Sequence, residues 1–142
     1  MEHTFLFKEG LWVVRGFYFD ENDNGIHVEG KARVTHSENL WIKDGYMKLL
    51  AEDGFEIKNK HEIIPFKKDF TTWKSSNPTL GTLRGRYMII DDTILSIFMS
   101  EDNQYTGIES NIQVSTNVYK CRGFTFKGNE KLSSWATELV YT

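Results

Sequence analysis

Three arginines and one glutamate in the second half of the chain are the residues best suited to hold a charged ligand. Arg84 and Arg86 are two positions apart, so they share one face of an extended strand, and Glu109 and Arg122 lie on later segments. A guanidinium group binds a carboxylate or phosphate through paired hydrogen bonds. We therefore predict an anion-binding role for them. The alternation of side chains along a strand does not decide whether Arg84 and Arg86 face the interior or form ion pairs in solvent.

Three aromatic or imidazole side chains complete the predicted site. His61 alternates with Ile57, Asn59 and Ile63 along one strand face, so it could project a polar ring into a cavity. The alternative is an exposed or internally hydrogen-bonded histidine, and for the tryptophans it is core packing. The predicted ligand-binding residues are His61, Trp73, Arg84, Arg86, Tyr87, Glu109 and Arg122.

No residue pattern indicates a metal centre or a cofactor site. The four histidines lack the spacing of metal ligands, and there is no Ser-His-Asp arrangement, Cys-His pair or glycine-rich phosphate loop. We therefore expect no metal, no cofactor and no dedicated catalytic residue. An enzyme acting on a carboxylate-bearing substrate, in which the paired arginines hold the carboxylate and Glu109 or a tyrosine moves a proton, is kept as an alternative.

The elements that must position these residues are short strands separated by turn signals about every 8 to 14 residues. Residues 67–80 break this rhythm and are expected to form a loop or a short irregular edge, with a turn at Asn77-Pro78. The first strand is rich in aromatic and β-branched residues and is expected to be buried on both faces. The predicted strands are 9–20, 25–36, 40–50, 55–66, 81–91, 93–99, 104–114, 118–127 and 131–141.

This repetition predicts an all-β fold, a single antiparallel meander barrel of about 8–10 strands, because closure removes the sheet edges that an open meander would expose. We expect residues 1–142 to form one domain, a length that can bury one sizeable core. Interior glycines on several of the strands would let strongly coiled strands bend where the sheet closes.

The tripeptide Gly10-Leu11-Trp12, on the first predicted strand, resembles the Gly-x-Trp motif of the calycin barrels, which include the lipocalins and the fatty-acid-binding proteins. The resemblance implies that Trp12 closes one end of the barrel and packs against an arginine of the last barrel strand, for which Arg122 is suitably placed. It also implies an interior that binds a small molecule, as in fatty-acid-binding barrels that use internal arginine and tyrosine side chains.

Composition narrows the classes of partner. The net charge is −3, and no basic block is present that would bind phosphates, so nucleic acid is not an expected partner. The chain carries a single cysteine, Cys121, and no segment typical of a signal peptide or a membrane span, so we expect a cytoplasmic protein without membrane insertion.

Together these features predict a small-molecule-binding barrel for a small amphipathic, hydrophobic or anionic ligand. Besides the enzyme alternative, a barrel filled by aromatic side chains, which acts only through its outer surface, is also consistent with the sequence. The oligomeric state is left open.

Overall fold

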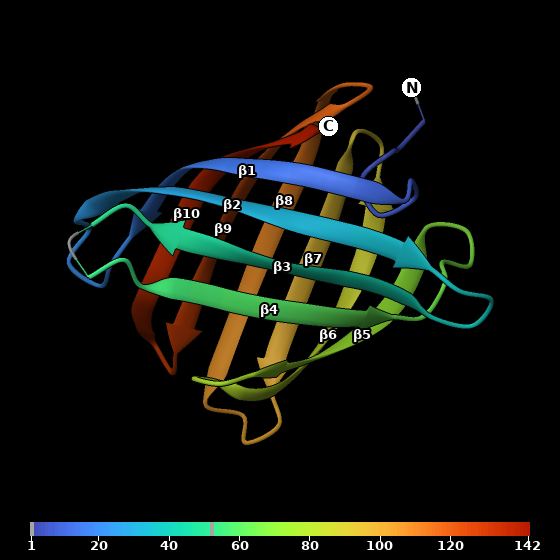
Figure 1. The fold of residues 1–142 in the computed structure, drawn as a ribbon. Coiled ribbons are helices and arrows are strands. Elements are labelled where there is room, and N and C mark those ends of the chain that lie inside the picture. Colours follow the sequence, from blue (N-terminus) through green and yellow to red (C-terminus); the bar gives the residue numbers. More distant parts are fainter. Residues whose placement is uncertain (1, 52) are drawn as a thin grey trace.

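The computed structural model describes residues 2–51 and 53–142, which form a closed antiparallel barrel (Figure 1). Each strand pairs with its neighbour in sequence, and β1 pairs with β10 to close the barrel, so the predicted all-β meander is confirmed. The strands are β1 (Gly10–Phe19), β2 (Gly25–His36), β3 (Trp41–Leu49), β4 (Glu56–Ile63), β5 (Phe70–Asn77), β6 (Gly81–Ile90), β7 (Thr93–Ser100), β8 (Tyr105–Ser115), β9 (Val118–Lys127) and β10 (Glu130–Tyr141). In the described residues there is no helix with the length and hydropathy that a membrane crossing requires.

Strand β5 corrects the prediction for residues 67–80, which we expected to form a loop or an irregular edge. Its inward side chains, Thr71, Trp73 and Ser75, are buried and alternate with exposed residues, which is the two-residue period of a strand. Two of these three inward residues are polar, and a hydrophobic pattern therefore does not reveal the period. The turn expected after Asn77 is present, where the Asn77 side-chain oxygen accepts a backbone hydrogen bond of 2.8 Å.

An aromatic cluster beneath the N-terminal segment closes one end of the barrel. Trp12 is fully buried, and its ring meets those of Phe5, Tyr119 and Tyr141 edge-on or nearly so, at centroid distances of 5.2, 5.7 and 5.3 Å. The backbone N–H of Thr4 donates to the Tyr119 hydroxyl at 3.0 Å and anchors the segment to β9. Trp12 therefore closes a barrel end, as the Gly-x-Trp resemblance implies.

Two details of the predicted first strand are wrong. Arg122 does not pack against Trp12; it is exposed on the outside of β9, and its guanidinium donates to the Cys121 carbonyl at 2.9 Å. The strand is also not buried on both faces, because Phe17 on the outer face of β1 is 41% exposed. A single closed sheet has no second layer around it, so outward side chains meet solvent.

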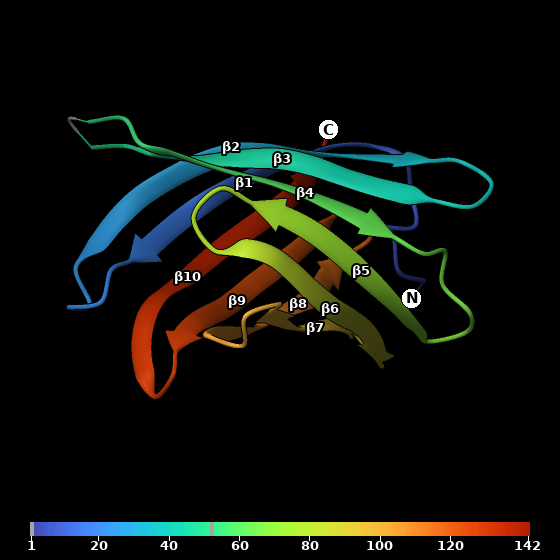
Figure 2. The ribbon, with the colours of Figure 1, turned by 90° about the horizontal axis from the view of Figure 1, so that it is seen from below.

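The barrel wall is interrupted between β4 and β5. These strands pair only where His61–Ile63 faces Trp73–Ser75, and they separate toward the β5–β6 turn (Figure 1). Figure 2 shows β2, β3 and β4 on one side of the barrel and β7, β8 and β9 on the other, with the interior between them. The fold therefore has a filled end at the N-terminal segment and a separation of strands toward the opposite end.

Candidate functional site

The interior holds a cavity of ≈ 300 Å³. Its walls are mostly apolar, with side chains such as Val14, Met47, Ile57, Leu83 and Leu139. Polar groups reach it from several strands, among them Lys43, His61, Glu109, Asn111 and Cys121. An interior filled entirely by aromatic side chains, one of the alternatives allowed by the sequence, is therefore not the arrangement that this chain adopts.

Lys43 is a buried cation on the wall of this cavity. It points inward from β3 on the same face as Gly45 and Met47 and is only 8% exposed. Within residues 2–51 and 53–142, the ion pairs are Arg84–Glu101 and Lys131–Asp23, so no described carboxylate lies within 4.0 Å of Lys43. Desolvating a charge without a counter-ion in contact is costly. The ammonium therefore has capacity to bind an anion.

His61 and Tyr87 adjoin Lys43. The His61 ring stacks on Trp73 with 4.1 Å between centroids and 5° between planes, and its Nδ1 lies 2.9 Å from the Tyr87 hydroxyl. Burial, with a smaller contribution from the Lys43 charge, holds the pKa of His61 well below its usual range. In a neutral ring one nitrogen donates and the other accepts, so the tautomer of His61 sets the direction of this hydrogen bond with Tyr87.

On the opposite wall, β8 presents a carboxylate and an amide. Glu109 accepts hydrogen bonds from Trp135 Nε1 at 2.9 Å and from Asn111 Nδ2 at 3.3 Å. Asn111 is completely buried, and its Oδ1 has no hydrogen-bond partner among the described residues. A buried acceptor without a partner costs about 1–3 kcal/mol. Asn111 can therefore accept a hydrogen bond from a ligand or a water molecule in the cavity.

Two glycines make room for the indole rings of the site. Trp73 lies beside Gly85 in the β5–β6 register, and Trp135 lies beside Gly123 in the β9–β10 register. A Cβ atom on either glycine would overlap the neighbouring indole ring. Glycine at these positions thus allows each ring to lie flat across the adjacent strand and to line the cavity.

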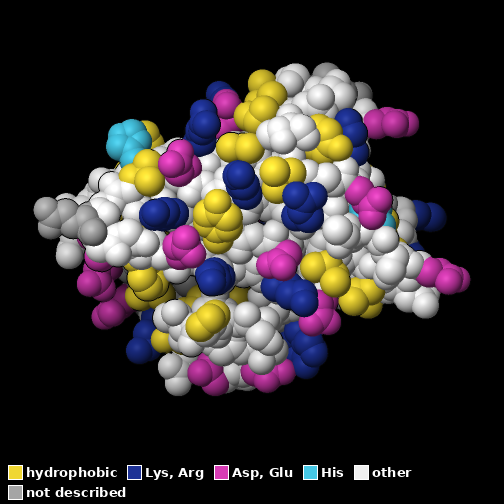
Figure 3. Space-filling view, viewed as in Figure 1, with side chains coloured by type: hydrophobic (Ala, Val, Ile, Leu, Met, Phe, Trp, Pro, Cys, Tyr) yellow, Lys and Arg dark blue, Asp and Glu magenta, His cyan; other side chains and the backbone are white. Residues whose placement is uncertain are grey.

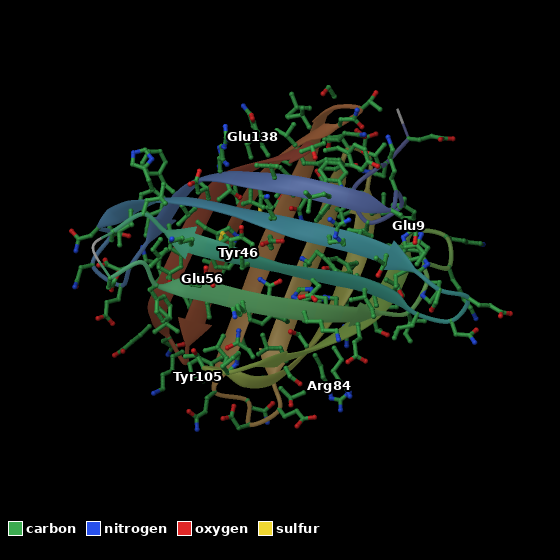
Figure 4. The ribbon with its side chains drawn as sticks, viewed as in Figure 1. Glu9, Tyr46, Glu56, Arg84, Tyr105 and Glu138 are labelled. Atoms are coloured by element: carbon green, nitrogen blue, oxygen red, sulfur yellow. The ribbon has the colours of Figure 1, made fainter. Side chains whose placement is uncertain are left out.

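The structure brings only part of the predicted site together. His61, Trp73 and Glu109 line the cavity, and Tyr87 touches this group through His61. The three arginines lie outside the barrel, and Arg84 pairs there with Glu101 at 2.9 Å. Figure 4 shows Arg84 at the edge of the molecule. The arginine residues predicted to hold an anion, Arg84, Arg86 and Arg122, do not reach the interior, and the cation found there is Lys43.

Sequence reasoning missed Lys43, Asn111 and Trp135. Lys43 could have been found, because it is the one charged residue on an otherwise uncharged face of β3. For Asn111 the signal was misleading, because the isoleucines of β8 lie on the opposite face and hydrophobic alternation favours placing them inside.

The depressed pKa of His61 predicts that the protein is less stable in mild acid. Unfolded His61 gains a proton near its ordinary pKa of about 6.5, whereas folded His61 stays neutral, so the unfolded state binds more protons below that pH. The free energy of unfolding should therefore fall with falling pH, by at most about 1.4 kcal/mol per pH unit. Urea titrations should show wild type losing about 1–2 kcal/mol more than His61→Gln between about pH 7 and pH 5. Parallel pH profiles for the two proteins would contradict the assignment.

The sequence matches no family model, and no curated protein shows significant similarity to it. Two solved structures resemble the barrel over nearly its whole length. One is the S-type phycobiliprotein lyase of Guillardia theta, with 9% identity, a TM-score of 0.72 and coverage of 97% of this chain and 90% of that chain. The other is Rv2717c of M. tuberculosis, with 11% identity, a TM-score of 0.71 and coverage of 94% and 92%.

The fold is calycin-like. This agrees with the resemblance carried by Gly10-Leu11-Trp12 and with the burial of Trp12 at a barrel end. At such low identity the likeness concerns the fold alone, so the function must be argued from the residues of this cavity.

Proposed function

We propose that this barrel binds a small amphipathic molecule, with an anionic head against Lys43 and an apolar part along the cavity wall. The observation that carries the proposal is the buried ammonium of Lys43, which faces the cavity without a carboxylate within 4.0 Å in the described chain. A ligand carboxylate would supply that missing partner, and a charge-assisted hydrogen bond is among the stronger polar contacts in proteins.

The charge of Lys43 is maintained by its surroundings. Burial lowers the pKa of this side chain, but its interactions with Tyr87, which include a hydrogen bond, and with the Glu109 carboxylate outweigh burial, and the pKa is raised. Lys43 is therefore protonated at neutral pH, as anion binding requires. Burial, followed by the charge of Glu109, raises the pKa of Cys121 well above its usual value, so the only thiol in the cavity stays protonated and is a poor nucleophile.

The cavity volume limits the ligand. A space of ≈ 300 Å³ equals about ten water molecules, at the lower end of small-molecule sites. This accommodates a head group with a short apolar tail, such as a carboxylate of about eight carbons.

The separation of β4 and β5 provides an entrance for such a ligand. Residues on both sides of this separation, Ile57 and Asn59 on β4 and Asn77 and Leu80 at the β5–β6 turn, line the cavity. Lys43 lies farther in, with its Nζ 5.8 Å from the centre of the Phe5 ring in the closed end. The head would therefore lie deep in the barrel and the tail toward the entrance.

The enzyme alternative receives no support from the position of the arginines. It required a pair of arginines that hold the substrate carboxylate inside the barrel, and Arg84 and Arg86 both lie on the outer surface of β6. Glu109 faces the cavity, but its two oxygens already accept hydrogen bonds from Trp135 and Asn111.

A matched pair of ligands tests the proposal. In calorimetric titrations, octanoate should bind saturably near one per chain, about tenfold or more tightly than 1-octanol, because only octanoate carries a negative charge that pairs with the Lys43 ammonium. A naphthalene-sulfonate dye displaced by octanoate offers a second readout. Equal affinity for the acid and the alcohol, or no saturable binding of either, would contradict the proposal.

A further inference from the structure

One side of the barrel turns apolar side chains outward. On β7, the outward side chains Leu95, Ile97 and Met99 are all apolar, whereas the inward positions hold Ser96 and Ser100 together with Ile94 and Phe98. On β8, the isoleucines likewise face outward while Glu109 and Asn111 face the interior. A strand that turns apolar side chains to solvent while polar ones face inward has an outer surface that burial would stabilise.

These side chains form one continuous surface. Ile97 is paired with Ile108, Ile108 with Phe124, and Met88 with Leu95, across the four neighbouring strands β6 to β9. Ile97, near the centre, is 50% exposed. The surface, here called the outer apolar face, consists of Met88, Ile90, Leu95, Ile97, Met99, Ile108, Ile112 and Phe124.

The opposite wall of the barrel carries many charged side chains on its outer surface. The outward positions of β2, β3 and β4 carry charged side chains, and Figure 3 shows basic and acidic groups interspersed over these strands. They include Lys31, Arg33, Asp44, Lys58 and Lys60. Single apolar side chains such as Phe17 and Tyr46 are exposed elsewhere, but the apolar side chains that are paired across neighbouring strands lie over β6 to β9. Continuous apolar patches of this kind mark interaction sites.

The composition of the outer apolar face is that of a protein interface. The outward positions within β6, β7 and β8 carry no lysine, aspartate or glutamate, and their only charged residues are Arg84 and Arg86; on β9, Lys120 and Arg122 lie at the border of the face. Interface cores are depleted in lysine, aspartate and glutamate and enriched in methionine, aromatic residues and arginine. This pattern fits a protein partner better than a freely solvated wall.

We propose that the outer apolar face is the interface of a symmetric dimer of this chain. Strands β6 to β9 are paired along both of their edges, so this face can associate with another copy only through its side chains. A second copy presents a sheet face of the same twist, and two such faces pack together in an aligned arrangement. Around a two-fold axis the same apolar face meets itself, with Ile97 near the centre.

The area of the outer apolar face indicates how tightly two copies should associate. Four strands about 4.8 Å apart, each with about four outward positions spaced by about 6.7 Å, cover on the order of 500 Å². Stable interfaces bury about 800 Å² per partner, and weaker ones about 600 Å² or less. At about 500 Å² per partner, the face belongs to the weaker class. The dimer should therefore be reversible, with a dissociation constant in the micromolar range.

Sedimentation equilibrium over about 1–500 µM protein tests the dimer. Wild type should shift from monomer to dimer, and Ile97→Glu should weaken association at least tenfold because it places a charge at the centre of the contact. The matched control is Phe17→Glu, which changes an equally exposed aromatic residue on the outer face of β1 and should leave association unchanged. If circular dichroism shows that Ile97→Glu is misfolded, Met99→Glu takes its place.

Several results would overturn this inference. One is a wild-type protein that stays monomeric throughout the range, and another is a dimer of unchanged strength in a folded Ile97→Glu variant. A monomer that co-sediments with phosphatidylcholine vesicles would assign the face to a lipid surface instead. The dimer does not depend on the ligand, because the outer apolar face and the cavity lie on opposite sides of the wall formed by β6 to β9.

Discussion

Replacing Trp12 with alanine should lower the free energy of unfolding by about 3–5 kcal/mol, the range found for large aromatic residues in protein cores. The indole is fully buried and packs against Phe5, Tyr119 and Tyr141 at the closed end of the barrel. Its removal would leave a void among rings that join β1, β9, β10 and the N-terminal segment. Urea denaturation at neutral pH measures the loss.

The conservative variant Trp12→Phe is the control. Nε1 of Trp12 has no hydrogen-bond partner in the described residues, so phenylalanine removes no hydrogen bond and loses only part of the buried ring. Its cost should be smaller, about 1–2 kcal/mol. If Trp12→Ala unfolds within about 1 kcal/mol of wild type, the aromatic cluster is not a principal source of stability and the role assigned to Gly-x-Trp is wrong.

Lys43→Met should weaken octanoate binding by about 10- to 100-fold, which corresponds to the roughly 1.5–3 kcal/mol of a hydrogen bond to a charged group. Methionine nearly preserves the length and apolar stem of lysine but removes the ammonium, so affinity for 1-octanol should change little. Titrating both ligands into wild type and Lys43→Met separates the effect of the ammonium charge from any change in the shape of the cavity.

Two control variants separate this effect from general changes in charge. Lys60→Met removes a cation from the outer face of β4 and should leave octanoate binding unchanged. Arg84→Met distinguishes the structure from the sequence-based prediction, because Arg84 was expected to bind the anion and instead pairs with Glu101 on the surface. Loss of octanoate binding in Arg84→Met, with no loss in Lys43→Met, would place the anion site elsewhere.

The architecture could be predicted because it depends on local information. Turn residues between short alternating runs define most of the strands, and the number of strands then requires closure to avoid exposed edges. Strand β5 was not predicted because its inward positions include Thr71 and Ser75, whose burial is not encoded in a hydrophobic pattern. Their polar groups are buried only after the neighbouring strands are in place.

The candidate site could be predicted only in part, because alternation groups residues into faces without identifying the inner face. Arg84 and Arg86 share a face with Met88 and Ile90, and the structure turns that face outward because Tyr87, on the other face, is completely buried. Likewise, Asn111 is buried on the inner face of β8, so the isoleucines on the other face of that strand point toward solvent.

By itself, the sequence determined most of the strands and their antiparallel order, since these follow from neighbouring residues and from the need to close the sheet. The burial of Trp12 was implied by the Gly-x-Trp resemblance. Only the tertiary structure decided which charges the cavity contains. Lys43 on β3 and Glu109 on β8 come from distant parts of the chain, and it is closure of the barrel that places them on the same cavity. The identity of an interior charge depends on this long-range arrangement, which no local pattern of residue types encodes.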